Sequence, residues 1–164
     1  VWVFQAMASD VWNMACRTDD KDSGPNCPWH QDEKNVGRDF DFGGSAILTS
    51  VNGKDVLLAG QKSGDLWALE AETGKLIWNR RVGEGSALGG NHWGIAADES
   101  RVFLTIADPI VAPDKAKPGV YAFAIKDGAP LWSYAAKPDC GPERKPKVTN
   151  CETRYGFSAT PMVV

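Results

Sequence analysis

The sequence predicts an all-β protein that forms a partial β-propeller of four-stranded antiparallel blades. The first observation is a hairpin pattern that occurs twice, as GDLWALEAETGKLIW in 64–78 and as GVYAFAIKDGAPLW in 119–132. The second is an apolar strand at matched spacing before each hairpin. The third is composition, because 17 Gly and 10 Pro in 164 residues favour short strands and tight turns over long helices.

The two hairpins share one register when they are aligned at Trp78 and Trp132. In that alignment Trp67 faces Tyr121, and each turn holds a Gly that can take the positive φ a hairpin connection needs. We therefore expect Trp78 and Trp132 to occupy equivalent, buried positions in consecutive blades.

Two further segments complete each repeated unit. An apolar strand precedes each hairpin, at 55–61 and 101–107, and a run of small residues precedes that strand, at 41–50 and 91–98. Small residues suit an innermost strand, where blades crowd around the axis. Four antiparallel strands in roughly 40–55 residues are typical of a propeller blade. A β-sandwich with coincidental internal similarity is the alternative.

The two ends of the chain fit the same unit. Trp2 is followed by VFQA, as a strand follows the other two Trp residues, and YGFSATPMVV begins like a further small-residue strand. Because closed propellers need about four to eight blades, we expect 1–164 to be a fragment, or the ordered part, of one propeller domain of a longer chain. The expected parts are the end of a blade (1–15), a Cys-bounded insert (16–40), a blade (41–83), a second blade (91–136), a second Cys-bounded insert (139–152) and the first strand of the next blade (155–164).

Four cysteines fall into two close pairs. The simplest pairing is local, Cys16 with Cys27 and Cys140 with Cys151, and each pair encloses ten residues of polar sequence. Such disulfides indicate an oxidising compartment, so we expect a periplasmic or secreted protein. Four free thiols are one alternative, and a zinc site using His30, three residues after Cys27, is another.

Charge and hydropathy exclude several functions. The net charge is −3 and no basic cluster is present, so no nucleic-acid partner is expected. No apolar run approaches the length of a membrane span.

Three stretches, in order, resemble the quinoprotein dehydrogenases, eight-bladed propellers that hold pyrroloquinoline quinone (PQQ) on their axis. They are WVFQAMASDVWNMA in 2–15, GQKSGDLWALEAETGKL in 60–76 and LGGNHWGIAADESRVFLTIAD in 88–108. The segment Thr73–Trp78 is similar to the Trp-docking repeat of that family. The variant GGNHWGIAAD and the Cys-bounded inserts resemble the polyvinyl-alcohol dehydrogenase branch most closely.

The resemblance implies several cofactor contacts. Lys62 takes the place of the Lys or Arg that contacts the quinone carbonyls, where a cation stabilises developing negative charge. Asn91 or His92 takes the place of an Asn that donates to the cofactor, and Trp93 would flank the cofactor or the substrate entrance. For each residue an ordinary role, as a surface Lys or a packed Trp, is the alternative.

The resemblance also implies that the catalytic Asp and the Ca²⁺ ligands precede Val1, so this chain should lack the complete active site. Asp108 and Asp114 are rival candidates in another register, as a base and, for Asp108, as a Ca²⁺ ligand. Asp39 and Asp41, just before an inner strand, could also point at the axis. No Cys-x-x-Cys-His occurs, so no c-type haem attaches here.

The function that the resemblance implies is a segment of a periplasmic alcohol dehydrogenase that uses PQQ and Ca²⁺. It would oxidise primary, secondary or polymeric alcohols, pass electrons to an acceptor such as a c-type cytochrome, and pack against the remaining blades of its propeller. The alternative is a non-catalytic propeller that acts as a scaffold or outer-membrane assembly factor.

Overall fold

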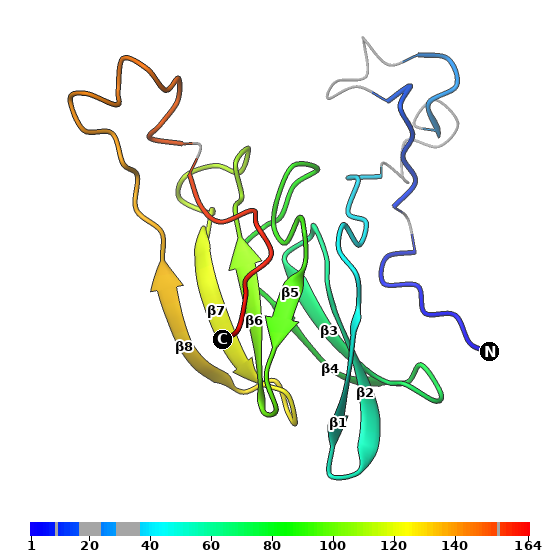
Figure 1. The fold of residues 1–164 in the computed structure, drawn as a ribbon. Coiled ribbons are helices and arrows are strands. Elements are labelled where there is room, and N and C mark those ends of the chain that lie inside the picture. Colours follow the sequence, from blue (N-terminus) through cyan, green and yellow to red (C-terminus); the bar gives the residue numbers. More distant parts are fainter. Residues whose placement is uncertain (9, 17–23, 29–36, 154) are drawn as a thin grey trace.

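The described residues form two four-stranded antiparallel sheets (Figure 1). The structure, a computed structural model, describes residues 1–8, 10–16, 24–28, 37–153 and 155–164. The sheets have the strand orders β1-β2-β3-β4 and β5-β6-β7-β8, each strand next to the one that follows it in the chain. The strands are β1 (Ile47–Val51), β2 (Lys54–Gly60), β3 (Asp65–Glu70), β4 (Leu76–Arg81), β5 (Ile95–Ala97), β6 (Arg101–Ile106), β7 (Gly119–Ala124) and β8 (Pro130–Ala135). The all-β class and the four-stranded antiparallel blades of a partial propeller are thus confirmed.

The two Trp hairpins have the same geometry. Trp78 lies opposite Ala68 and Trp132 lies opposite Ala122, and in both sheets the register shifts at the next residue. The turns are also alike, since Gly74 and Gly128 have φ values of 72° and 67°. The repeat seen in the sequence is therefore a repeat in space.

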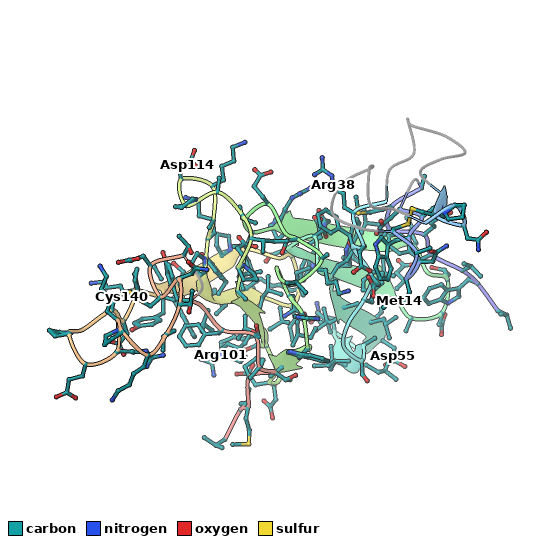
Figure 2. All side chains as sticks on the ribbon, turned by 90° about the horizontal axis from the view of Figure 1, so that it is seen from above. Met14, Arg38, Asp55, Arg101, Asp114 and Cys140 are labelled. Carbon is teal, nitrogen blue, oxygen red and sulfur yellow. A yellow bond between two sulfur atoms is a disulfide. The ribbon has the colours of Figure 1, made fainter. Side chains whose placement is uncertain are left out.

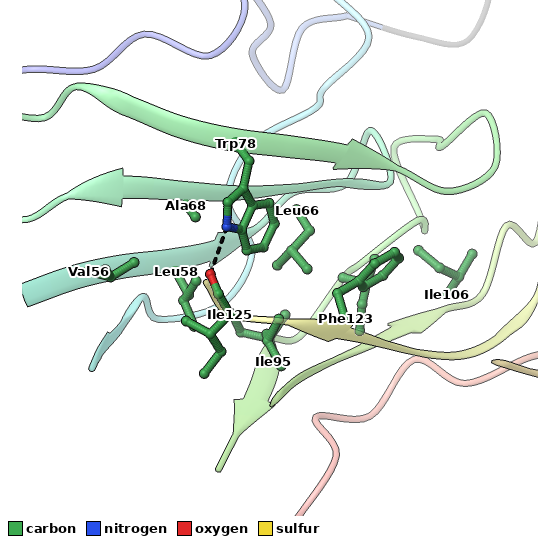
Figure 3. Close-up of a cluster of buried hydrophobic side chains, with 11 residues drawn as sticks. Val56, Leu58, Leu66, Ala68, Trp78, Ile95, Ile106, Phe123 and Ile125 are labelled. Carbon is green, nitrogen blue, oxygen red and sulfur yellow. Dashed lines mark hydrogen bonds between the residues drawn. The ribbon is translucent and has the colours of Figure 1, made fainter. Parts of the chain in front are cut away.

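The hydrophobic core lies between the two blades (Figure 3). One face of the first sheet packs against one face of the second, and the buried side chains come from both. Trp78 is only 6% exposed, and its indole N–H donates to the carbonyl of Ile125, 2.7 Å away, in the turn of the following blade. The buried cluster comprises Val56, Leu58, Leu66, Ala68, Trp78, Ile95, Val102, Leu104, Ile106, Phe123 and Ile125.

The expected burial of Trp132 was wrong. Its register matches that of Trp78, but 47% of the residue is exposed. The reason is that a Trp at this position is covered by the turn of the next blade, as the Trp78 ring is by Gly128. Among the described residues no hairpin lies beyond β8 to cover Trp132.

Trp2 occupies on the first blade the position that Trp78 occupies on the second. Its indole N–H donates to the carbonyl of Ala71 over 2.9 Å, and its ring lies against Gly74. Among the described residues of 1–15 and 155–164 none lies in a strand, and Val11 alone makes an isolated bridge. Instead, 155–164 crosses the second blade, where Phe157 N–H donates to the Ile106 carbonyl over 3.2 Å.

Both predicted disulfides are present, Cys16–Cys27 and Cys140–Cys151, and none of the described cysteines is free. The alternative of free thiols was therefore wrong. His30, invoked for the zinc alternative, lies outside the described residues. Within the described residues, no helix has the length and apolar character that a bilayer crossing requires.

Candidate functional site

The candidate site lies where several connecting segments meet at one end of the blades. The turn between β2 and β3, the connection from β4 to β5 and the segment before β1 all reach this end (Figure 1). Gly43 and Gly44 let the backbone before β1 come against His92, Trp93 and Gly94, since a Cβ at either Gly would overlap those residues. The small residues of the inner segments thus allow the close approach that the sequence predicted.

Lys62, in the β2–β3 turn, binds two carboxylates. Its Nζ lies 3.2 Å from Oδ2 of Asp39 and 3.1 Å from Oδ1 of Asp41. Only 10% of the Lys62 side chain is exposed, whereas 59% of the Asp41 side chain is. We call Asp39, Asp41 and Lys62 the lysine–acid cluster.

Asp10 fixes the backbone that carries the two acids. Its carboxylate accepts the N–H of Asp39 over 3.0 Å and the N–H of Phe40 over 2.5 Å. Asp39 has a φ of 59°, a conformation unusual for a residue other than Gly. In addition, Gln61 donates its side-chain N–H to the Phe40 carbonyl over 2.6 Å. Sequence reasoning missed Asp10, although it is the Asp of the stretch that resembles the quinoprotein motif.

The two acids of the cluster have opposite shifts in pKa. Burial, with the neighbouring Asp41 carboxyl, raises the pKa of Asp39 against the opposing effect of Lys62. Burial alone would also raise the pKa of Asp41, but hydrogen bonds with Asp39 and Lys62 outweigh it and hold that pKa below its usual range. Asp39 is thus the stronger base of the two, and Asp41 remains ionised to lower pH than Asp39 does.

An open cavity of about 450 Å³ adjoins the cluster. Asp39 and Asp41 line it together with the aromatic residues Phe4, Trp12, Phe40 and Phe42, of which Trp12 and Phe42 are exposed and Phe40 is buried. Flat apolar walls beside a few polar groups are what a planar organic molecule requires of a binding site.

Asn91 is directed into the protein rather than into this cavity. It is completely buried, and its side-chain N–H₂ donates to the carbonyls of Gly94 (2.8 Å) and Thr105 (3.0 Å). Both amide hydrogens are used within the blade, so none is left to donate to a cofactor.

His92 and Trp93 lie against each other at the same end of the blades. Their rings stack with centroids 4.4 Å apart and planes 12° from parallel, and Trp93 is 58% exposed. These two residues are therefore open to a ligand, unlike Asn91.

Asp108 and Asp114 do not join the lysine–acid cluster. Asp108 is buried and accepts the N–H of Lys117 over 3.0 Å, and burial raises its pKa. The segment 83–85 separates it from Lys62, because Gly83 faces Asp108 while Gly85 faces the Lys62 carbonyl. Asp114 is exposed on a loop that projects from the sheets (Figure 2).

No calcium site is evident in the described part of the chain. The one group of three metal-capable side chains found there is Cys140, Cys151 and Glu152, and its two sulfurs form a disulfide. Asp108 belongs to no such group of three among the described residues.

Comparison with known proteins gives the family. A model of PQQ-type repeats, described as outer membrane protein assembly factor BamB, matches residues 9–155. The chain belongs to this PQQ-repeat family. Membership in the PQQ-repeat family explains why the hairpins that end at Trp78 and Trp132 share one register.

Two curated relatives in the PQQ-repeat family are named polyvinylalcohol dehydrogenase. The one from Pseudomonas sp is 39% identical over 137 residues, which are 82% of this chain and 20% of the relative. The one from Sphingopyxis sp. (strain 113P3) is 38% identical over 141 residues, 84% of this chain and 21% of the relative. The chain thus spans about a fifth of the length of these relatives.

Solved structures with partial similarity include BamB from Moraxella catarrhalis and a europium-containing methanol dehydrogenase. The first gives a TM-score of 0.41 with 21% identity, over 57% of this chain and 24% of that one. The second gives 0.42 with 19% identity, over 57% of this chain and 16% of that one.

Proposed function

We propose that this chain is a segment of a PQQ-dependent alcohol dehydrogenase that oxidises primary, secondary or polymeric alcohols. The observation that carries the proposal is the 39% identity, over 82% of the chain, with a polyvinylalcohol dehydrogenase. The lysine–acid cluster beside an aromatic cavity supports it, since alcohol oxidation needs a base for the hydroxyl proton and a cation beside the electron acceptor.

The residues of the cluster fit a quinone in part. Lys62 supplies a positive charge behind Asp39 and Asp41, which line the cavity, but its Nζ is already within 3.2 Å of three carboxylate oxygens. The exposed rings of Trp12 and Phe42 offer the aromatic surface. Asp10, Asp39 and Asp41 make the surroundings of Lys62 negative, so the carboxylates of PQQ would need partners elsewhere in the protein. When bound, PQQ supplies a two-electron acceptor for alcohol oxidation.

The chain's own residues have separable roles in this proposal. In this proposal Asp39, rather than an Asp before Val1 as the sequence resemblance implies, accepts the proton of the alcohol hydroxyl, and its raised pKa suits that role. Asp41 keeps Lys62 in place through contacts of 3.1 and 3.2 Å, and Lys62 stabilises negative charge that develops next to it. Asp10 holds the backbone of Asp39, so that the base does not move away from Lys62.

Location and partners belong to the same proposal. The two disulfides are consistent with a periplasmic or secreted protein. We further propose that Ca²⁺ is bound by residues outside the described part of this chain, and that the electron acceptor is a protein such as a c-type cytochrome.

A second candidate is a non-catalytic propeller that acts as a scaffold or assembly factor. The description of the matching family model, which names an outer membrane protein assembly factor, favours it. A scaffold does not require an acid–cation cluster at the mouth of a cavity.

The test is dye-linked alcohol oxidation by the full-length protein with PQQ and Ca²⁺, comparing wild type with Lys62→Ala. We expect an active wild type and a kcat lowered about 10²-fold in the variant, the scale for losing one group that stabilises developing charge. Lys115→Ala, an exposed lysine on the 109–118 loop, is the matched control and should keep full activity.

One result would contradict the whole proposal, and a second would contradict only the role of the lysine–acid cluster. A wild-type protein that is inactive on primary, secondary and polymeric alcohols and does not bind PQQ would favour the scaffold. An active wild type with an equally active Lys62→Ala variant would leave the enzyme assignment intact but remove the lysine–acid cluster from the site.

A further inference from the structure

The stacked rings of His92 and Trp93 form an open platform. Their planes are 12° from parallel, so the imidazole supports one face of the indole, and the 58% exposure of Trp93 leaves much of the rest open. The backbone beneath is fixed, because Thr160 donates its hydroxyl to the Trp93 carbonyl over 2.8 Å and Gly44 packs against the same carbonyl.

The polar end of Trp93 is also free. The indole N–H groups of Trp2, Trp67 and Trp78 each donate to a protein acceptor, at 2.9, 3.1 and 2.7 Å. Within the described ranges, no acceptor takes the indole N–H of Trp93, and neither ring nitrogen of His92 is hydrogen-bonded. The platform therefore offers an apolar face together with unused polar groups at its rim.

The platform lies beside the lysine–acid cluster. Gly43, two residues after Asp41, packs directly against the backbone carbonyl of His92. The Lys62 N–H donates to the Asp41 carbonyl over 3.1 Å, so Lys62 is tied to the same segment. The platform thus adjoins the cluster through the segment 41–43, although neither His92 nor Trp93 lines the 450 Å³ cavity itself.

We propose that His92 and Trp93 form a binding subsite for the chain of a neutral polyol whose reacting hydroxyl lies at the lysine–acid cluster. This inference rests on the proposed function. A chain of alternating CH₂ and CHOH groups places C–H bonds on the indole face and hydroxyls at the free N–H and imidazole nitrogens. Asp10, Asp39 and Asp41 outnumber Lys62, which disfavours anionic polymers at the same place.

The experiment compares a long and a short substrate on the full-length enzyme with PQQ and Ca²⁺. The substrates are poly(vinyl alcohol) and 2-propanol, which is too short to reach from the cluster across the platform. For Trp93→Ala we expect the KM for the polymer to rise about tenfold, the effect of losing one aromatic contact, while both constants for 2-propanol stay within about twofold. Trp93→Phe, which keeps a ring but loses the N–H, should have a KM for the polymer between those of wild type and Trp93→Ala.

Ile110→Ala is the matched control, because Ile110 is also half exposed but lies on the β6–β7 loop. It should leave the KM for the polymer unchanged. Because Trp93 is exposed, its replacement should also leave the melting temperature of the protein close to that of wild type.

Each contrary result has a distinct meaning. An unchanged KM for the polymer in Trp93→Ala would overturn the subsite. An equal fall in kcat/KM for the polymer and for 2-propanol would overturn it as well. A weaker PQQ affinity in that variant would mean that the platform serves the cofactor, which also overturns it. If the wild type oxidises no alcohol, equilibrium binding of poly(vinyl alcohol) to the protein without turnover decides the matter. Loss of that binding in Trp93→Ala would then support the subsite while the proposed function fails.

Discussion

At the scale of single residues, Asp39 links the geometry of the site to a pH dependence. Its pKa is raised, so the carboxyl becomes protonated as pH falls through a value above the ordinary one for Asp. If Asp39 is the base, kcat/KM of the full-length enzyme should fall on the acid side of its pH profile. Asp39→Asn should lower kcat by about 10²-fold or more and remove that acid limb. An Asp39→Asn enzyme that keeps the limb would assign it to another group.

Asp98 has the opposite shift in pKa, and its consequence is for stability rather than activity. Its carboxylate accepts the N–H of Ser100 and pairs with Arg101, which together lower its pKa to about 2. A lowered pKa means that the stabilisation is complete above the unfolded value of 3.8 and is lost as pH falls through about 2.

We therefore expect Asp98→Asn to lower the melting temperature slightly at pH 7 and to have no effect near pH 1.5. Thermal unfolding of both proteins across this range is the measurement, and parallel curves at every pH would contradict the expected linkage. Asp55, an exposed acid on β2, provides the control substitution Asp55→Asn.

At the scale of elements, the turn between β7 and β8 depends on Gly128. Its φ is 67°, and a Cβ would lie 2.7 Å from the ring of Trp78. Gly53 also has a positive φ, 76°, but its surroundings are open. Gly53→Ala should therefore cost about 1–2 kcal/mol from backbone strain alone. Gly128→Ala should lower the free energy of unfolding by more, because the Trp78 indole must also move. Denaturant unfolding of the two variants separates the backbone strain from the steric overlap with Trp78.

The sequence predicted the Trp hairpins but not the side-chain contacts of the segments around the site. The repeat of Gly, aromatic residue, turn and Trp predicted β3–β4 and β7–β8 in the correct register, because local turn chemistry and strand period decide them. It did not predict the orientation of Asn91, since no pattern tells whether an amide faces a ligand or two backbone carbonyls. The role of Asp10 was missed because its contacts with Asp39 and Phe40 span 29 and 30 residues.

At the scale of the whole molecule, the exposed face of β8 shows what these two blades lack. Leu131, Trp132 and Tyr134 are between 47% and 59% exposed on one strand. In the isolated 164-residue chain, Trp78→Ala should lower the free energy of unfolding by about 3–5 kcal/mol, as other truncations of buried aromatic residues do. Trp132→Ala should lower it clearly less, because Trp132 is half exposed.

In the full-length protein, where we propose that another blade covers β8, the two substitutions should cost similar amounts. Unfolding of both variants in both contexts is the measurement. If Trp132→Ala remains mild in the full-length protein, no blade docks on that face.

The hydrogen bond from Trp78 to Ile125 also bears on the order in which the structure comes apart. Each indole is anchored in the neighbouring turn, so a blade is held by the Trp before it as well as by its own ladder. A row of stacked blades unfolds first at the blade that has a neighbour on one side only, because a blade between two neighbours is held on both sides. Here that blade is β5–β8, whose β8 face is exposed. Amide protons of β7 and β8 should therefore exchange with solvent sooner than those of β2 and β3. Mechanical pulling on the C-terminus should detach the second blade while the first, held by Trp2, stays folded.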